Sequence, residues 1–163
     1  RADRESSEGV VLAKVSDDNT YGIIISLNCE TDFVAKNEEY IQLAQSLASH
    51  ALNYSDKDSF LNSEFEGMKV SDKLLEQTGV IGEKIEIGSF EYLESEFVGS
   101  YIHAGSKIAS IVGLSEKFDN ADEVSKDISM QVAAMNPVAL DENGVSQEII
   151  EKVIRTIRKL PYQ

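Results

Sequence analysis

The fold depends on one stretch that joins an apolar run to a compact polar segment, Tyr21-Gly22-Ile23-Ile24-Ile25-Ser26-Leu27-Asn28-Cys29-Glu30-Thr31-Asp32-Phe33-Val34-Ala35-Lys36-Asn37. Its apolar part, residues 21–27, predicts a buried strand, because short apolar runs bounded by turn signals are typical of one. Helical periodicity begins just after Asn37. A connection from a strand to a helix usually contains Gly, Ser or Asn. The aromatic Phe33 is therefore expected either to fold back onto the core or to be held out for a partner.

A weak internal repeat organises the rest of the chain. In its first copy, strands over 9–16 and 21–28 predict a β-hairpin, because Asp and Asn between them tolerate left-handed turn conformations. Asn37 is a suitable N-cap for the helix that follows. A further strand over 84–93 is expected to complete a three-stranded antiparallel sheet.

The second copy repeats this plan. Strands over 97–102 and 107–114 predict another hairpin, and a helix follows. The helix has one apolar face, formed by Ala121, Val124, Ile128, Val132 and Met135. A last helix is expected over 147–158, so no third strand remains for this sheet. The hairpin should then have an open edge beside Ile108 and Val112, which invites pairing with another chain.

These units predict an α+β fold of two duplicated lobes, each a small antiparallel sheet packed with helices. The expected boundary separates an N-terminal core subdomain, 1–95, from a C-terminal one, 96–163. Between the repeats, 56–61 and 71–77 predict short helices, with Gly79 at the end of the second.

Composition sets the broad class. The chain has 163 residues, 42% of them hydrophobic and 27% charged, which is typical of a globular protein. Its single cysteine, Cys29, excludes an internal disulfide and suits a reducing compartment. One Cys and two His cannot form a closed Cys/His zinc site. We expect no cofactor and a cytoplasmic location.

The net charge of −14 argues against direct contact with nucleic acid, because such contact depends on Lys and Arg meeting phosphates. The charge suits either a solvated surface or steering toward a basic protein. No apolar run approaches the roughly 20 residues of a membrane span, so no membrane partner is expected.

Three segments carry a family resemblance. Residues 28–37, 99–103 and 127–137 resemble, in the same order, the characteristic segments of the elongation factor Ts family. Members of this family promote guanine-nucleotide exchange on the GTPase elongation factor Tu. The resemblance spans about 8–152 and implies the same partner and function here.

The resemblance also implies a binding surface for the GTPase. In the family, the Asp-Phe pair that matches Asp32 and Phe33 contacts the partner's nucleotide-binding domain, with the Phe beside the magnesium site. A His at the position of His103 also lies at that interface. The predicted contacts are Thr31, Asp32, Phe33, Val34, His103, Met130 and Ala134.

Three of these residues, and Cys29 beside them, also have a purely structural interpretation. If helix geometry began at Thr31, Phe33 would share a face with Tyr40 and be buried. Asp32 could simply stabilise helix N-terminal amides, and Thr31 suits a turn or a cap. Cys29 could be a nucleophile, but a Cys that ends an apolar strand is usually a small core residue.

The helix after the second hairpin has a wide apolar arc. Met130, Ala133 and Ala134 extend it beyond one face, so the helix is expected to contact either the other lobe or another protein. This leaves a second hypothesis, a self-associating module, such as a homodimer, without exchange activity.

Two other features bear on function. Residues 79–84 contain two Gly and a Lys but lack the P-loop spacing, so the chain is expected to bind no GTP or GDP itself and to catalyse no covalent chemistry.

Relative to the family, we expect it to lack the N-terminal helical domain, the coiled-coil arm after 151–152, and the strand beyond that arm which covers the second sheet. It would then be a fragment or a divergent form.

Overall fold

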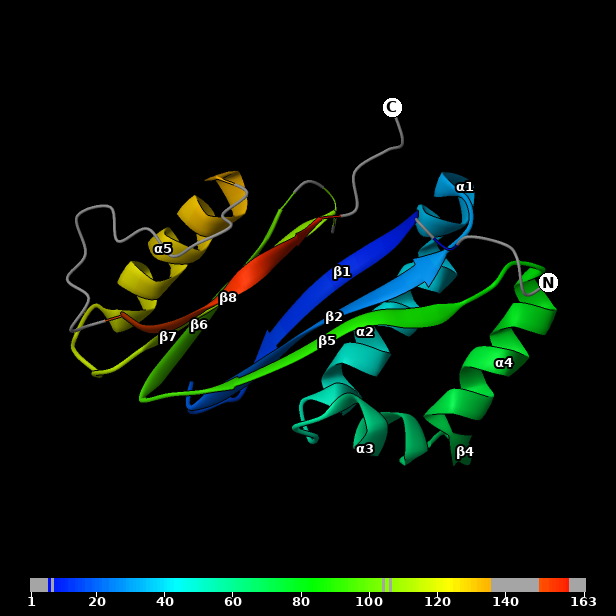
Figure 1. The fold of residues 1–163 in the computed structure, drawn as a ribbon, viewed down its shortest axis with the longest axis horizontal. Helices are drawn as coiled ribbons and strands as arrows, with labels where there is room; N and C mark the ends of the chain where they lie inside the picture. The colour runs from blue at the N-terminus through cyan, green and yellow to red at the C-terminus, as the bar shows by residue number, and fades with distance from the viewer. Residues whose placement is uncertain (1–5, 7, 104, 106, 136–149, 159–163) are drawn as a thin grey trace.

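The computed structural model describes residues 6, 8–103, 105, 107–135 and 150–158. Two antiparallel sheets lie at the centre, and helices cover their outer faces (Figure 1). From left to right in that view, a helix is followed by the second sheet, the first sheet and the helices of the first half of the chain. The fold is α+β, as the sequence predicts.

The first sheet has three strands in the order β1 (Glu8–Val15), β2 (Tyr21–Cys29) and β5 (Glu86–Glu94). β2 is central and pairs antiparallel with both neighbours, which confirms the predicted sheet. A register shift between Ser26 and Leu27 marks a β-bulge against β5.

Helices cover the outer face of this sheet. The longest is α2 (Glu38–Ala51), and the side chain of its N-cap, Asn37, accepts a hydrogen bond from the Tyr40 amide, as predicted. Leu47 and Phe60 are fully buried there together with Ile23 and Ile25 of β2.

The segment between α2 and β5 forms α3 (Lys57–Asn62), α4 (Val70–Ile81) and a small hairpin, β3 (Glu64–Phe65) with β4 (Met68–Lys69). The two helices confirm the predicted ones, but Gly79 lies inside α4 and does not end it. Gly82 ends the helix instead, with a φ of 82°, a left-handed conformation that favours glycine.

The second sheet also has three strands, β6 (Phe97–His103), β7 (Ile108–Leu114) and β8 (Ile150–Arg158). β7 pairs antiparallel with both of the others. The predictions of a helix over 147–158 and of an open edge on β7 are therefore wrong. β8 is the counterpart of β5, and it occupies the edge that we expected to attract another chain.

The outer face of this sheet packs against α5 (Ala121–Met135). Val112 and Leu114 of β7 are fully buried against Ile128 and Val132 of the helix. The predicted face is thus confirmed for Ala121, Ile128 and Val132, with Val124 partly buried beside them. The predicted stop at 136–137 lies outside the described residues.

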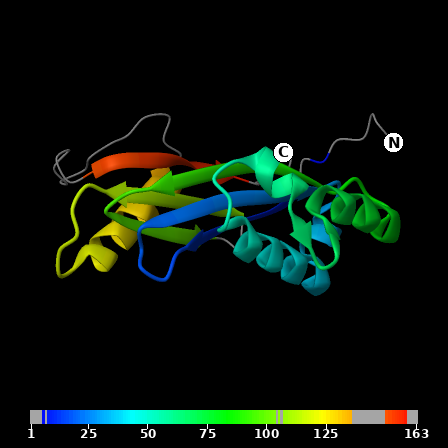
Figure 2. The ribbon, with the colours of Figure 1, turned by 90° about the horizontal axis from the view of Figure 1, so that it is seen from below.

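The inner faces of the two sheets pack against each other. Val11 and Ile24 of the first sheet form one cluster with Val98, Ala109 and Ile111 of the second. Figure 2, at right angles to the first view, shows the strands running lengthwise through an elongated molecule. β2 is thus covered on both sides, which explains its continuous apolar run.

No helix of the described residues is both long enough and apolar enough to span a membrane.

Candidate functional site

The polar segment after β2 forms a short helix, α1 (Asp32–Ala35). Thr31 is its N-cap, and its hydroxyl accepts a hydrogen bond from the Val34 amide at 3.3 Å. The same hydroxyl donates to Oε2 of Glu83 at 2.6 Å, and Oε1 of Glu83 accepts from the Thr31 and Glu30 amides at 3.0 Å. One carboxylate from the α4–β5 connection therefore fixes the start of α1.

Glu83 was not predicted as part of this site. It lies 52 residues from Thr31 in the sequence, and no local pattern around it marks it as a partner of α1. The amides at the start of a helix need an acceptor, but the sequence does not indicate which residue supplies it.

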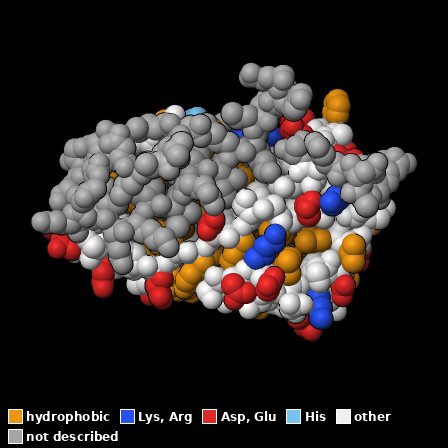
Figure 3. Space-filling view, viewed as in Figure 1, with side chains coloured by type: hydrophobic (Ala, Val, Ile, Leu, Met, Phe, Trp, Pro, Cys, Tyr) orange, Lys and Arg blue, Asp and Glu red, His pale blue; other side chains and the backbone are white. Residues whose placement is uncertain are grey.

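Phe33 points away from the protein. Its side chain is 88% exposed, whereas Ala35, on the same short helix, is buried. In Figure 3 a hydrophobic side chain projects beyond the surrounding surface over α1. The interpretation of Phe33 as a core residue is therefore wrong, and the exposed orientation is confirmed.

A shallow pocket of about 260 Å³ lies at the base of Phe33. It is lined by Phe33, Val34, Asn37, Glu39, Tyr40 and Ile81. Val34 is half-buried there and packs against the hydrophobic core between the first sheet and its helices. The aromatic ring thus stands beside a small depression whose floor belongs to α2 and α4.

Asp32 forms two ion pairs. Its carboxylate oxygens lie 2.8 Å from Nζ of Lys36 and 3.2 Å from Nζ of Lys107. Hydrogen bonds from Lys36 and then Lys107 lower the pKa of the Asp32 carboxyl below its usual value. Asp32 therefore carries a negative charge at neutral pH directly beside the exposed ring.

Cys29 is structural. It is fully buried at the end of β2, and its thiol lies 3.2 Å from the Thr31 carbonyl oxygen. Burial raises the pKa of this thiol, which disfavours the reactive thiolate. The nucleophile hypothesis has no support in this geometry.

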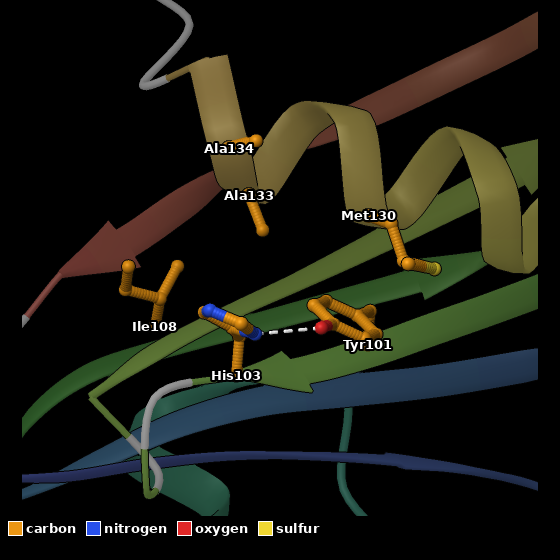
Figure 4. A pocket seen from close by; sticks show the side chains of 6 residues that line it. All are labelled: Tyr101, His103, Ile108, Met130, Ala133 and Ala134. Atoms are coloured by element: carbon orange, nitrogen blue, oxygen red, sulfur yellow. Dashed lines mark hydrogen bonds between the residues drawn. The ribbon is translucent and has the colours of Figure 1, made fainter.

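A second surface feature, the α5 pocket, lies between the β6–β7 hairpin and α5. It has a volume of about 380 Å³ and is lined by Tyr101, His103, Ile108, Met130, Ala133 and Ala134. Figure 4 shows Met130 and Ala133 pointing from the helix toward the side of the sheet that carries Tyr101 and His103. The extra apolar residues of the wide helix arc thus line an open pocket, and Met130 is 41% exposed.

Polar groups at the floor of this pocket are held in place. The Tyr101 hydroxyl lies 2.6 Å from Nδ1 of His103, and the two rings stack with centroids 5.6 Å apart. The pocket therefore combines an oriented imidazole with an apolar helix face.

The structure places the predicted site residues in two groups. Thr31, Asp32, Phe33 and Val34 lie together on α1, whereas His103, Met130 and Ala134 lie together around the α5 pocket. Lys107, directly before β7, connects to the first group through its contact with Asp32. Sequence reasoning assigned Lys107 only to a strand.

Among the residues that the structure describes, no group of three or more His, Cys, Asp or Glu could hold a metal ion. An exposed aromatic residue next to a fixed charge, together with an open apolar pocket, is typical of proteins that act by contact with another protein. The protein is thus an α+β protein whose surface offers two candidate contact sites.

Comparison with known proteins identifies the family. The sequence profile described as Elongation factor TS matches residues 30–160. The chain is 63% identical over 154 residues to elongation factor Ts of Christiangramia forsetii, covering 94% of this chain and 56% of the relative. It is 52% identical over 160 residues to that of Flavobacterium psychrophilum, covering 98% and 58%. For Rhodopirellula baltica, 43% identity extends over 155 residues, covering 93% and 47%.

The chain belongs to the elongation factor Ts family. It spans about half the length of the curated relatives that it matches. The predicted family resemblance is thus confirmed.

Proposed function

We propose that this chain is the part of a translation elongation factor Ts that binds the GTPase elongation factor Tu and promotes its release of GDP. The exposure of Phe33 is the observation that carries the proposal, because an 88% exposed aromatic side chain on a well-anchored helix gains much by burial against a partner. We infer a protein-binding role without covalent chemistry, in the cytoplasm, where translation takes place.

The proposed mechanism follows from linkage. An exchange factor binds the nucleotide-free GTPase more tightly than the loaded form, so it must weaken nucleotide binding by the same factor. Phe33 is proposed to insert near the magnesium site of the GTPase, and the charged Asp32 to contact the displaced elements. The weakened magnesium and phosphate contacts would then release GDP.

The α5 pocket is proposed as the second contact. Its lining offers an apolar helix face and the oriented ring of His103, so it suits an apolar segment with a polar group at one end. With residues 1–95 and 96–163 as two subdomains, each would supply one contact.

Replacing Phe33 tests the proposal. Phe33→Ala should slow the release of a fluorescent GDP analogue from elongation factor Tu by about 30-fold or more, because losing one aromatic anchor costs roughly 2 kcal/mol of binding. Its free energy of unfolding should change by no more than about 0.5 kcal/mol, as for other exposed positions.

Leu75→Ala is the matched control, since Leu75 is a large apolar residue of α4 that is 71% exposed. This variant should keep full exchange activity. Equal activity of the two variants, or a loss of more than about 3 kcal/mol of stability in Phe33→Ala, as for core Phe truncation, would contradict the proposal.

A further inference from the structure

We propose that Lys107 is a positioning residue that holds the two contact sites, α1 and the α5 pocket, at a fixed spacing. The inference rests on the proposed function, because it concerns how the two contacts act together on the GTPase. It is carried by the position of the Lys107 ammonium group, which reaches from the turn between β6 and β7 to two acceptors in the first half of the chain.

The ammonium group contacts two acceptors from distant parts of the chain. Nζ of Lys107 donates to the Gly9 carbonyl at 3.1 Å and to Oδ1 of Asp32 at 3.2 Å. Gly9 is near the start of β1, and Asp32 is the first residue of α1, directly before Phe33. One side chain of the second sheet thus holds the edge of the first sheet and the helix that presents Phe33.

The backbone of Lys107 is tied to the other contact. Its amide donates to the His103 carbonyl at 3.2 Å, and the next residue, Ile108, lines the α5 pocket. Two hydrogen bonds in series, His103 to Lys107 and Lys107 to Asp32, therefore connect the pocket to α1. In Figure 1 the ends of β6 and β7 near this turn lie on the same side of the molecule as α1.

Burial distinguishes this pair from the other ion pair of Asp32. The Lys107 side chain is only 17% exposed, whereas that of Lys36 is 73% exposed. Lys36 also lies only four residues from Asp32 in the sequence, so this ion pair cannot fix the position of α1 relative to the second sheet. Exposed pairs within a helix contribute little, whereas a partly buried pair between distant elements restricts their relative motion.

A fixed spacing strengthens binding through two contacts. When the first contact forms, the second one meets its site at an effective concentration that depends on how rigidly the two are connected. Loosening the connection lowers this effective concentration without removing either contact. The Lys107–Asp32 pair therefore acts on affinity through the spacing of Phe33 and His103.

The test compares Lys107→Met with its matched control, Lys36→Met. Affinity for nucleotide-free elongation factor Tu should fall about three- to tenfold in Lys107→Met, less than the loss of a whole charge-assisted hydrogen bond, because looser spacing removes neither contact with the partner. It should change less than about twofold in Lys36→Met, since exposed pairs are weak. Lys107→Arg, which keeps the charge and the donors, should restore most of the loss, and Lys107→Gln offers a milder neutral variant if Lys107→Met fails to fold.

A double-mutant cycle separates positioning from a direct contact. In the parent chain, Phe33→Ala and His103→Ala should be coupled by a factor proportional to the effective concentration of the second contact. In the Lys107→Met background this coupling should shrink by the same factor as the affinity. An affinity loss with unchanged coupling would mean that Lys107 touches the partner itself, and would overturn the proposal.

The two hypotheses fail in different ways. If Phe33→Ala leaves GDP release unchanged, the proposed function fails and this inference fails with it. If Phe33→Ala slows release but Lys107→Met binds as the parent does, only the positioning role is wrong. Faster amide exchange over residues 32–35 in Lys107→Met than in Lys36→Met would support the role independently of activity.

Discussion

At the scale of single residues, Tyr40 supports the surface from which Phe33 projects. Its side chain is buried, and its hydroxyl donates to the Leu27 carbonyl at 2.6 Å, close to the bulge between β2 and β5. Burial raises the pKa of this phenol far above its ordinary value, so the hydroxyl stays a donor at any physiological pH. The bond ties α2 to the end of the strand that leads into α1.

Tyr40→Phe should therefore lower the free energy of unfolding by about 1–3 kcal/mol, because it leaves a buried carbonyl without its donor. Tyr101→Phe removes a hydroxyl whose hydrogen bond is exposed, and it should cost no more than about 0.5 kcal/mol. Urea unfolding of both variants makes the comparison. Equal costs would show that the Tyr40 bond contributes nothing beyond a surface contact.

At the scale of elements, the close approach of the two sheets depends on Gly22 in β2. A Cβ at this position would lie 2.7 Å from Cδ1 of Ile111 and 2.8 Å from the Lys14 carbonyl oxygen. The second contact is with backbone, which cannot move aside without shifting β1. Gly22 is thus required by packing between the sheets.

Gly22→Ala should destabilise the protein by about 1–3 kcal/mol, the usual cost of overpacking a core. Gly79→Ala provides the opposite case, since Gly79 lies within α4 and a Cβ there would meet no atom within 4 Å. That variant should gain about 0.5–1 kcal/mol, because Ala favours the helix over the unfolded chain. Thermal melts that shift in the same direction for both variants would contradict this account.

β8 shows why an element can be mistaken in the sequence. Ile150, Val153, Ile154 and Ile157 recur at helical spacing, so the apolar pattern by itself does not distinguish a strand from the expected helix here. The pairing of β8 with β7 contains two register irregularities, and such irregularities break the strict alternation of a strand. The high share of β-branched residues, five of the nine in Ile150–Arg158, was the signal that favoured a strand.

At the scale of the whole molecule, stability near neutral pH should depend on His50. Its ring packs against Tyr54, Phe60 and Phe65, so it joins α2 to α3 and β3, and its Nε2 lies 2.8 Å from the Ser63 hydroxyl. Burial lowers the pKa of this imidazole below its ordinary value. These aromatic surroundings favour the neutral ring.

The sign of the pH effect follows from this shift. The unfolded chain binds the His50 proton more readily than the folded one, so stability is full above the ordinary pKa of about 6.5 and falls as the pH drops through it. The free energy of unfolding should therefore decrease between about pH 7 and pH 5.5 in the parent chain.

His50→Gln should remove this slope, whereas His103→Ala, at the other histidine, should keep it. Urea unfolding at several pH values tests the prediction. A slope that survives in His50→Gln, or disappears in His103→Ala, would show that another group is responsible.

The sequence by itself determined the local structure. Short apolar runs, turn residues and an N-cap are local signals, so they indicated the hairpins, α2 and α5 and the duplicated plan. The characteristic segments at 28–37, 99–103 and 127–137 likewise indicated the family, because a match of residue types needs no coordinates.

Only the tertiary structure decided which side chains meet and which stay exposed. Phe33 has the same apolar character whether it is buried or exposed, and its orientation depends on the anchoring of α1 by Glu83, 52 residues from Thr31. The pairing of Lys107 with Asp32, 75 residues apart, likewise requires the two sheets to be packed together. Such contacts arise from the free energy of the whole packed chain, to which widely separated residues contribute jointly, so no local pattern records them.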